Sequence, residues 1–124
     1  MNVISTTAAP AAIGPYSQAI EANGTVYVSG QLPIDPATGE FALGGIQAQA
    51  RQSLTNMKNI LAEAGLTMQN VAKVTVLLAD IADFAAVNEV YAEFFSAPFP
   101  ARSAFQVAAL PKGAGVEIEA IAVK

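Results

Sequence analysis

The sequence contains no cysteine and no histidine. Disulfide bonds, thiol nucleophiles, zinc sites built on these two residue types and Ser-His-Asp catalysis are therefore excluded. Any chemistry must instead use carboxylates, arginine, lysine, tyrosine, serine, asparagine or backbone groups.

Charged residues are also scarce. They make up 13% of the 124 residues, whereas a typical soluble domain contains about 25%. Hydrophobic residues make up 53%, yet no apolar run approaches the ~20 residues that a membrane-spanning helix needs. We therefore expect the apolar surplus to be buried between copies of the chain, in a homo-oligomer. The length predicts a single domain over residues 1–124.

Positive charge is limited to six lysines and arginines, against ten acidic residues, which gives a formal net charge of −4. Without a basic tract, binding of nucleic acid through its phosphates is not expected. The first residues lack the basic and apolar segments of a secretory signal. We therefore expect a cytoplasmic protein that does not bind membranes.

Local patterns predict the secondary structure. The predicted strands are Val3–Thr6, Ser17–Ala22, Thr25–Ser29, Val71–Ala79, Arg102–Ala108 and Gly115–Val123. The predicted helices are Ile46–Ala64, which Gly65 ends, and a second one with the apolar stripe Phe84, Val87, Tyr91 and Phe94 or Phe95. Asn23-Gly24 predicts a hairpin turn. This order predicts an α+β fold with two helices on one face of a mixed sheet and a parallel crossover.

Two carboxylates occur in the last predicted strand. Side chains alternate between the two faces of a sheet, so Glu117 and Glu119 share a face with Ile121 and Val123. In this apolar company at least one carboxylate is expected to be half-buried, with a raised pKa. The alternative is a solvated strand face whose charges discourage edge pairing.

Arginine occurs only at positions 51 and 102. Arg51 falls on the polar face of the first helix and is predicted to be solvated. Arg102 follows Pro98 and Pro100 and opens a strand. Its fork of N–H groups suits a carboxylate bound through two parallel hydrogen bonds, and the alternative is a structural ion pair.

Other polar residues give weaker signals. Tyr16 and Ser29 bracket the first hairpin, and Gly30 would allow close approach to the backbone. Asn88 falls in the second helix, where a polar surface residue is the simpler interpretation. Neither a Rossmann nor a P-loop glycine pattern is present.

Four short motifs occur in order along nearly the whole chain. They are Ala11–Ala19, which contains Gly14-Pro15-Tyr16, then Val28–Pro33, Pro100–Ser103 and Glu117–Ala120. With Gln49–Gln52 and Asp83–Asn88 between them, they resemble the Rid family (YjgF-like imine deaminases), and its RidA branch most.

The resemblance implies a chorismate-mutase-like α+β sandwich that assembles as a homotrimer. The three sheets would form a barrel-like core, with clefts between subunits. It also implies hydrolytic deamination of reactive 2-imino and enamine acids, such as 2-aminoacrylate and 2-aminocrotonate, to 2-keto acids and ammonia. The family uses no metal ion and no organic cofactor.

The family's site residues carry over by motif. The resemblance implies that Arg102 holds the substrate carboxylate, while Glu117 orients water and transfers protons. The other implied contacts are Tyr16, Ser29, Asn88 and the backbone groups of Gly30 and Ala104. Many relatives have cysteine where this chain has Ala104, so a thiol there is not required, and many have arginine where it has Ala109. The second departure affects substrate range or a subunit contact.

Three other functions stay open at this point. The fold could serve as a small-carboxylate binding or regulatory module without turnover. An RNA-directed activity has been proposed for relatives, although the acidic balance argues against it here. A purely structural assembly protein would use only the apolar surplus and would lack a polar site between subunits.

Overall fold

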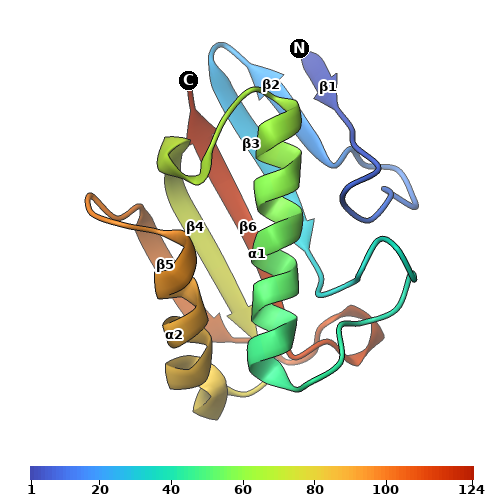
Figure 1. Cartoon of the computed structure of the whole chain (residues 1–124), viewed down its shortest axis with the longest axis vertical. Coiled ribbons are helices and arrows are strands. Elements are labelled where there is room, and N and C mark those ends of the chain that lie inside the picture. Colours follow the sequence, from blue (N-terminus) through green and yellow to red (C-terminus); the bar gives the residue numbers. More distant parts are fainter.

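The computed structural model describes all 124 residues, which form one six-stranded sheet covered by two helices. The elements are β1 (Asn2–Ile4), β2 (Ala19–Ala22), β3 (Thr25–Gln31), α1 (Ile46–Glu63), β4 (Val71–Leu78), α2 (Phe84–Phe94), β5 (Ala101–Gln106) and β6 (Val116–Val123). Short 3₁₀ turns span Met68–Asn70, Ile81–Asp83 and Pro111–Gly113. Both helices lie on the same face of the sheet (Figure 1).

The strand order is β1-β2-β3-β6-β4-β5, and only β4 and β5 run parallel. The α2 crossover therefore joins parallel neighbours, as the sequence predicts. The Asn23-Gly24 turn is also confirmed, since its residues have φ of 52° and 77°. β1 confirms the short strand expected over Val3–Thr6, although it begins at Asn2 and ends at Ile4.

Some element boundaries differ from the prediction, and hydrogen bonding explains why. β2 begins at Ala19 because the carbonyl of Ser17 accepts a hydrogen bond from the Ser29 hydroxyl. β3 continues to Gln31, which pairs with Ile118 of β6. β5 ends at Gln106, opposite Leu78, the last residue of its only partner strand.

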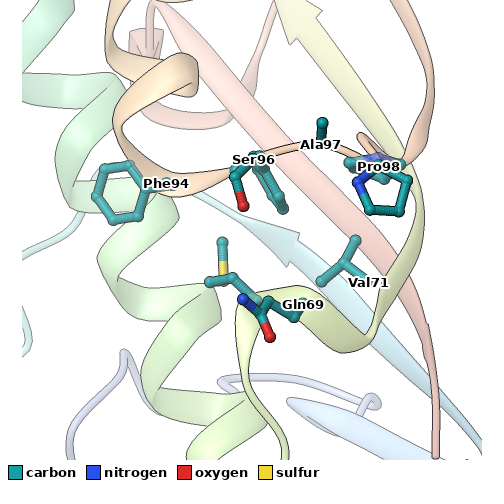
Figure 2. Close-up of a pocket in the computed structure, with 9 residues that line it drawn as sticks. Gln69, Val71, Phe94, Ser96, Ala97 and Pro98 are labelled. Carbon is teal, nitrogen blue, oxygen red and sulfur yellow. The ribbon is translucent and has the colours of Figure 1, made fainter.

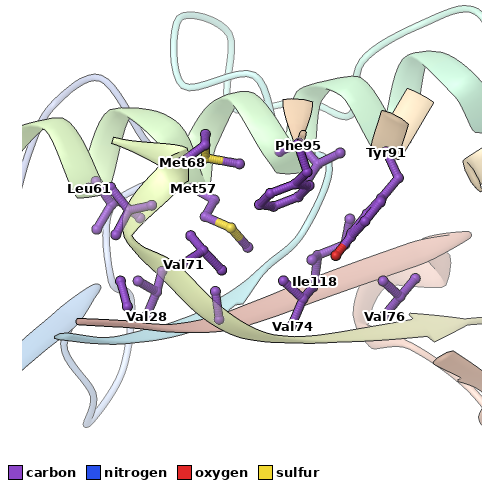
Figure 3. Packing of buried hydrophobic residues seen from close by; sticks show 14 of the residues in the cluster. Val28, Met57, Leu61, Met68, Val71, Val74, Val76, Tyr91, Phe95 and Ile118 are labelled. Atoms are coloured by element: carbon purple, nitrogen blue, oxygen red, sulfur yellow. The ribbon is translucent and has the colours of Figure 1, made fainter. Parts of the chain in front are cut away.

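The core lies between α1 and the sheet (Figure 3). The 3.6-residue repeat of α1 turns Leu54, Met57 and Leu61 inward, and each is fully buried. Every second side chain of the central strands points toward α1 and packs against these residues. Val74 and Ile118 are two of them, and both are fully buried. Burying one such side chain contributes about 2 kcal/mol, so this layer provides much of the stability.

The second helix corrects one detail of the predicted core. Its buried residues are Val87, Val90 and Tyr91, with Phe95 just beyond its end. Phe84 is only partly buried: it packs against the edge of the core and also lies beside Arg102 of β5.

The face of the sheet opposite the helices carries exposed apolar side chains. Tyr27 is 50% exposed, Phe105 48% and Val123 47%. These residues come from β3, β5 and β6, so exposed apolar side chains occur on three strands of this face. Neither α1 nor α2 is long and apolar enough to cross a membrane.

Candidate functional site

A cavity of about 660 Å³ opens between the N-terminal loop, the end of β3 and the open face of β6. Of the predicted site residues, it brings together Tyr16, Ser29, Gly30 and Glu117. Glu119 and Lys112 also line it, so it contains two carboxylates and one ammonium group. We call it the β3–β6 cavity.

Glu117 lies on the open face of β6 and is half-buried. Burial raises its pKa above the usual glutamate value, and the charge of Glu119 two residues along the strand adds to the effect. A half-buried carboxyl with a raised pKa was one of the two outcomes that the sequence left open, and it is confirmed.

Gly30 is packed directly under the Glu117 carboxylate. A Cβ atom at position 30 would lie 2.8 Å from Oε1 and 2.9 Å from Cδ of Glu117. Any side chain at position 30 would have to displace the Glu117 carboxylate, so the glycine matters here for room rather than for backbone freedom. The glycine thereby sets the resting place of the carboxylate.

Two buried amides that sequence reasoning missed hold the walls of the cavity. Gln18 is 3% exposed, and its side chain accepts a hydrogen bond from the amide of Thr6 and donates to the carbonyls of Thr6, Ala9 and Pro10. This ties down the loop that leads to Tyr16. A glutamine at the entrance to a β-strand gives no specific sequence signal for such a role.

Asn56 holds the opposite wall. It is fully buried in α1 and donates to the carbonyls of Leu32 and Ile34, at 3.2 and 2.9 Å. Its position could have been noticed, because it falls on the apolar face of α1 between Ser53 and Ile60. A polar residue in that stripe requires a partner, and the loop after β3 supplies it.

Arg102 lies on β5 against the side of α2. Its Nη1 donates a hydrogen bond of 2.6 Å to Oδ1 of Asn88. Its Cζ lies 5.4 Å from the ring centroid of Phe84 and 4.7 Å from that of Tyr91. We call these four residues the Arg102 cluster. The predicted alternative of an ion pair is not what the structure shows, because all three partners are uncharged.

The two ion pairs of the chain lie elsewhere. They join Arg51 to Glu93 and Lys124 to Glu21, each at 2.9 Å. Arg51 was predicted to be solvated, and its side chain is 48% exposed, but it also links α1 to α2 through this pair. The guanidinium of Arg102 is thus the one in the chain without a carboxylate.

Arg102 and Glu117 lie on opposite faces of the sheet within one chain. Arg102 is paired with Val74 of β4, and Glu117 with Leu77. Positions three apart on a strand face opposite ways, so the arginine is on the helix side and the glutamate on the open side. Ala104 is on the arginine side, opposite Val76. The predicted site is therefore divided into two halves.

A further groove of about 290 Å³ lies where α2 ends (Figure 2). Its lining residues are Met68, Gln69, Val71, Phe94, Phe95, Ser96, Ala97, Pro98 and Pro100. None of them has a titratable side chain, so the groove offers no acid or base. No group of three or more acidic residues is arranged to hold a metal ion.

The chain belongs to the family described as Endoribonuclease L-PSP, whose model matches residues 6–124. A goat (Capra hircus) protein named 2-iminobutanoate/2-iminopropanoate deaminase is 61% identical over 99% of this chain and 90% of its own length. RidA from the Antarctic bacterium Psychrobacter sp. PAMC 21119 has a crystal structure with a TM-score of 0.96 and 50% identity, covering 100% of both chains. Escherichia coli TdcF with bound serine has a TM-score of 0.96 and 48% identity, covering 100% of this chain and 99% of its own. These matches confirm the resemblance to the Rid family.

Proposed function

We propose that this chain hydrolyses 2-imino acids and their enamine tautomers, such as 2-aminoacrylate and 2-aminocrotonate, to 2-keto acids and ammonia. The name of the goat relative supports this reaction. The observation that carries the proposal is the guanidinium of Arg102, which is exposed, held by neutral groups and free of any carboxylate. A small carboxylate substrate supplies the missing partner.

Arg102 binds the substrate carboxylate through its fork of N–H groups. Asn88 occupies one donor at Nη1, and the remaining donors stay available for two parallel hydrogen bonds. This fixes the orientation of the imine carbon and lowers the entropic part of the barrier. A lysine at this position would supply charge without the fork.

Glu117 handles the protons. Its raised pKa suits a group that takes a proton from water as the oxygen attacks the imine carbon. The carbinolamine that forms carries one new C–O bond, and Glu117 returns the proton to its nitrogen. Glu117 then passes the proton of the hydroxyl to the amino nitrogen, the C–N bond breaks, ammonia leaves, and the oxygen becomes the carbonyl of the 2-keto acid. Proton transfer of this kind contributes typically about 10²–10⁴-fold to the rate.

The complete site lies between two copies in a homotrimer with the chorismate-mutase-like arrangement. Two facts support this proposal. Arg102 and Glu117 face opposite ways in one chain, so one copy cannot place both on the same small substrate. The open face exposes Tyr27, Phe105 and Val123, which a central barrel of three sheets would cover. Arg102 of one copy then meets Glu117 and Tyr16 of the next.

The reaction is tested by supplying the unstable substrate as it forms. A pyridoxal-phosphate dehydratase acting on serine or threonine releases the enamine, and keto acid and ammonia are followed with time. Added wild-type chain is expected to accelerate both products in proportion to its concentration. Unchanged release at every concentration would reject the deaminase. The Arg51→Ala variant, which alters the only other arginine, serves as the positive control.

The shared site is tested by co-expressing Arg102→Ala with Glu117→Gln. Each variant alone lacks one half of every site. A mixed trimer regains one intact site of three, and random mixing makes three quarters of trimers mixed, so roughly one quarter of wild-type activity is expected. Co-expression of Arg102→Ala with the double variant restores no site and is the control. Absence of recovery in the first mixture would place both residues in one chain's site or in none.

A small-carboxylate binding module is the second candidate. It is favoured by the structure of TdcF, which has 48% identity to this chain and contains bound serine, a small carboxylate. Calorimetry with 2-oxobutanoate separates the two functions. Binding that is lost in Arg102→Ala, together with no acceleration in the enamine assay, would favour the module over the enzyme.

An RNA-directed activity is raised by the description of the family model. The formal charge of −4 opposes it, and Lys112 shares the β3–β6 cavity with two carboxylates. A binding affinity for RNA that falls steeply with salt would revive it. The deamination proposed above uses only water and side chains. The cytoplasmic location expected from the sequence remains a prediction.

A further inference from the structure

Three residues along one side of α2 contact the same side chain, Arg102 of the neighbouring strand β5. Phe84, Asn88 and Tyr91 are spaced four and three residues apart, so they project from the same side of the helix. All three reach Arg102, the rings at 5.4 and 4.7 Å from Cζ and the amide at 2.6 Å from Nη1. A helix face whose two rings also pack in or against the core therefore surrounds a cation.

The rings and the amide act on the guanidinium in different ways. An aromatic ring attracts the positive charge through its electron-rich face, within about 6 Å of the centroid. This contact uses the flat surface of the group and leaves its N–H edge free. A carboxylate neighbour would instead occupy that edge, as Glu93 does with Nε and Nη2 of Arg51. The cluster thus fixes the guanidinium without consuming its fork.

We propose that Tyr91 is a positioning residue, whose ring holds the Arg102 guanidinium in the orientation that receives the substrate carboxylate. The inference rests on the proposed function, because it concerns how Arg102 is presented to an anion. Tyr91 itself does not touch the substrate. Its ring is the closer of the two to Cζ and is nearly buried, at 6% exposure, so it is the more rigid support.

The ring of Tyr91, rather than its hydroxyl, makes this contact. The hydroxyl is buried without a hydrogen-bond partner and points toward the sheet (Figure 3). Burial raises its pKa, against the opposing effect of Arg102, so it stays neutral. A phenylalanine would keep the ring and remove an unsatisfied polar group. The Tyr91→Phe variant is therefore expected to preserve the positioning.

Tyr91 also packs in the core, so the test needs a control for packing. Its ring centroid lies 4.5 Å from that of Phe95, which is equally buried, whereas the rings that face the Arg102 guanidinium are those of Phe84 and Tyr91. Phe95→Leu removes a ring from the same region. Tyr91→Leu removes the ring that faces the guanidinium, so any difference between the two variants reports on Arg102.

Steady-state kinetics in the enamine assay give the first readout. Tyr91→Leu is expected to raise KM about tenfold while kcat changes less than about twofold, because carboxylate binding is weakened before and during the reaction alike. Tyr91→Phe and Phe95→Leu should keep KM within about twofold of wild type. An equal rise in KM for Tyr91→Leu and Phe95→Leu, or no rise for either, would overturn the proposal.

Fluorinated phenylalanines at position 91 give a second test that does not depend on how Tyr91→Leu folds. Fluorine keeps the shape of the ring and weakens the negative charge of its face. KM is expected to increase stepwise with the number of fluorine atoms while kcat holds. A KM that does not vary along this series would show that the ring acts only through its shape, against the proposal.

Nuclear magnetic resonance distinguishes failure of this inference from failure of the proposed function. Two arginines give two Nε–Hε signals, and Arg51→Ala assigns them. The Arg102 signal is expected to be displaced by ring currents, and to move toward the Arg51 position in Tyr91→Leu but not in Phe95→Leu. An unmoved signal overturns the positioning role whatever the activity. If wild type shows no turnover, the deaminase fails, and 2-oxobutanoate binding replaces KM in the same comparison.

Discussion

The two halves of the proposed site are built on opposite principles. On the β5 side, Arg102 is exposed and every contact it makes is to a neutral group of α2. On the β6 side, Glu117 is half-buried, rests on Gly30 and has a like charge nearby in Glu119. One half keeps its charge and offers it outward. The other half is placed where negative charge is costly, so its carboxyl keeps its proton to a higher pH than an ordinary glutamate.

The difference shows how one sheet can carry both an available cation and a carboxyl with a raised pKa, built from ordinary residues. Neutral partners orient an ion without neutralising it, so the guanidinium remains available to a ligand. Burial and a like charge do not orient Glu117, but they move its pKa toward the range where it can act as base and acid. The predictions below each disturb one half and leave the other unchanged.

The largest effect is expected from removal of the cation. Arg102→Ala loses two charge-assisted hydrogen bonds to the substrate, each contributing about 1.5–3 kcal/mol, so kcat/KM should fall about 10³-fold. Arg102→Lys should recover only part of this loss because it lacks the fork. Circular dichroism and sedimentation are expected to match wild type. Retention of more than a tenth of the activity in Arg102→Ala would contradict the assigned role.

A smaller loss of activity is expected when a side chain is added at Gly30, next to the Glu117 carboxylate. Gly30→Ala places a methyl group 2.8 Å from the Glu117 carboxylate and displaces it, so kcat should fall about 10- to 100-fold. The same substitution in a Glu117→Gln background should cost little more, since the carboxylate is already absent. Additive losses in the double variant would mean that Gly30 acts independently of Glu117.

The charge of Glu119 is expected to shift the pH profile of the activity. Activity that needs Glu117 as base should rise with pH as this carboxyl ionises, and its raised pKa sets where the rise occurs. Glu119→Gln removes the nearby charge, lowers the pKa of Glu117 and moves the rise to lower pH, with about twofold more activity on the acid side. Glu93→Gln changes net charge equally and should leave the profile in place. Coincident profiles for all three proteins would exclude the coupling.

The smallest effect concerns stability. The native state of Glu117 has the higher pKa, so it binds more protons than the unfolded state between the ordinary glutamate value and the raised one. The free energy of unfolding should therefore decrease as pH rises through this range. Glu117→Gln cannot ionise and should be more stable than wild type at neutral pH, by less than about 1 kcal/mol because the group is only half-buried. Urea denaturation at several pH values measures the difference.

Much of the fold follows from the sequence because its signals are local. The Asn23-Gly24 turn, the repeat of α1 and the alternation in β6 each require only neighbouring residues. The same alternation predicted that at least one of Glu117 and Glu119 would be half-buried with a raised pKa, and Glu117 is that residue. Boundaries such as the start of β2 depend on hydrogen bonds to distant residues and were displaced by up to two positions.

The relation between the two halves could not be predicted from local signals. The family motifs assign Arg102 and Glu117 to one site, but the faces of the sheet on which they lie depend on the register of β5 and β6 against β4. The anchoring by Gln18 and the cluster around Arg102 likewise join residues that are distant in sequence. The spacing of Phe84 and Tyr91 in the sequence predicts an apolar helix face, and it does not show that this face also contacts Arg102.

The amides that hold the β3–β6 cavity have a further consequence. Gln18 and Asn56 fasten its walls to backbone carbonyls, and neither side chain gains or loses a proton near neutral pH. The scaffold therefore stays constant over the interval in which Glu117 changes charge. Acidification alters the chemistry of the hollow without altering its outline, so reactivity and shape are governed by separate sets of atoms.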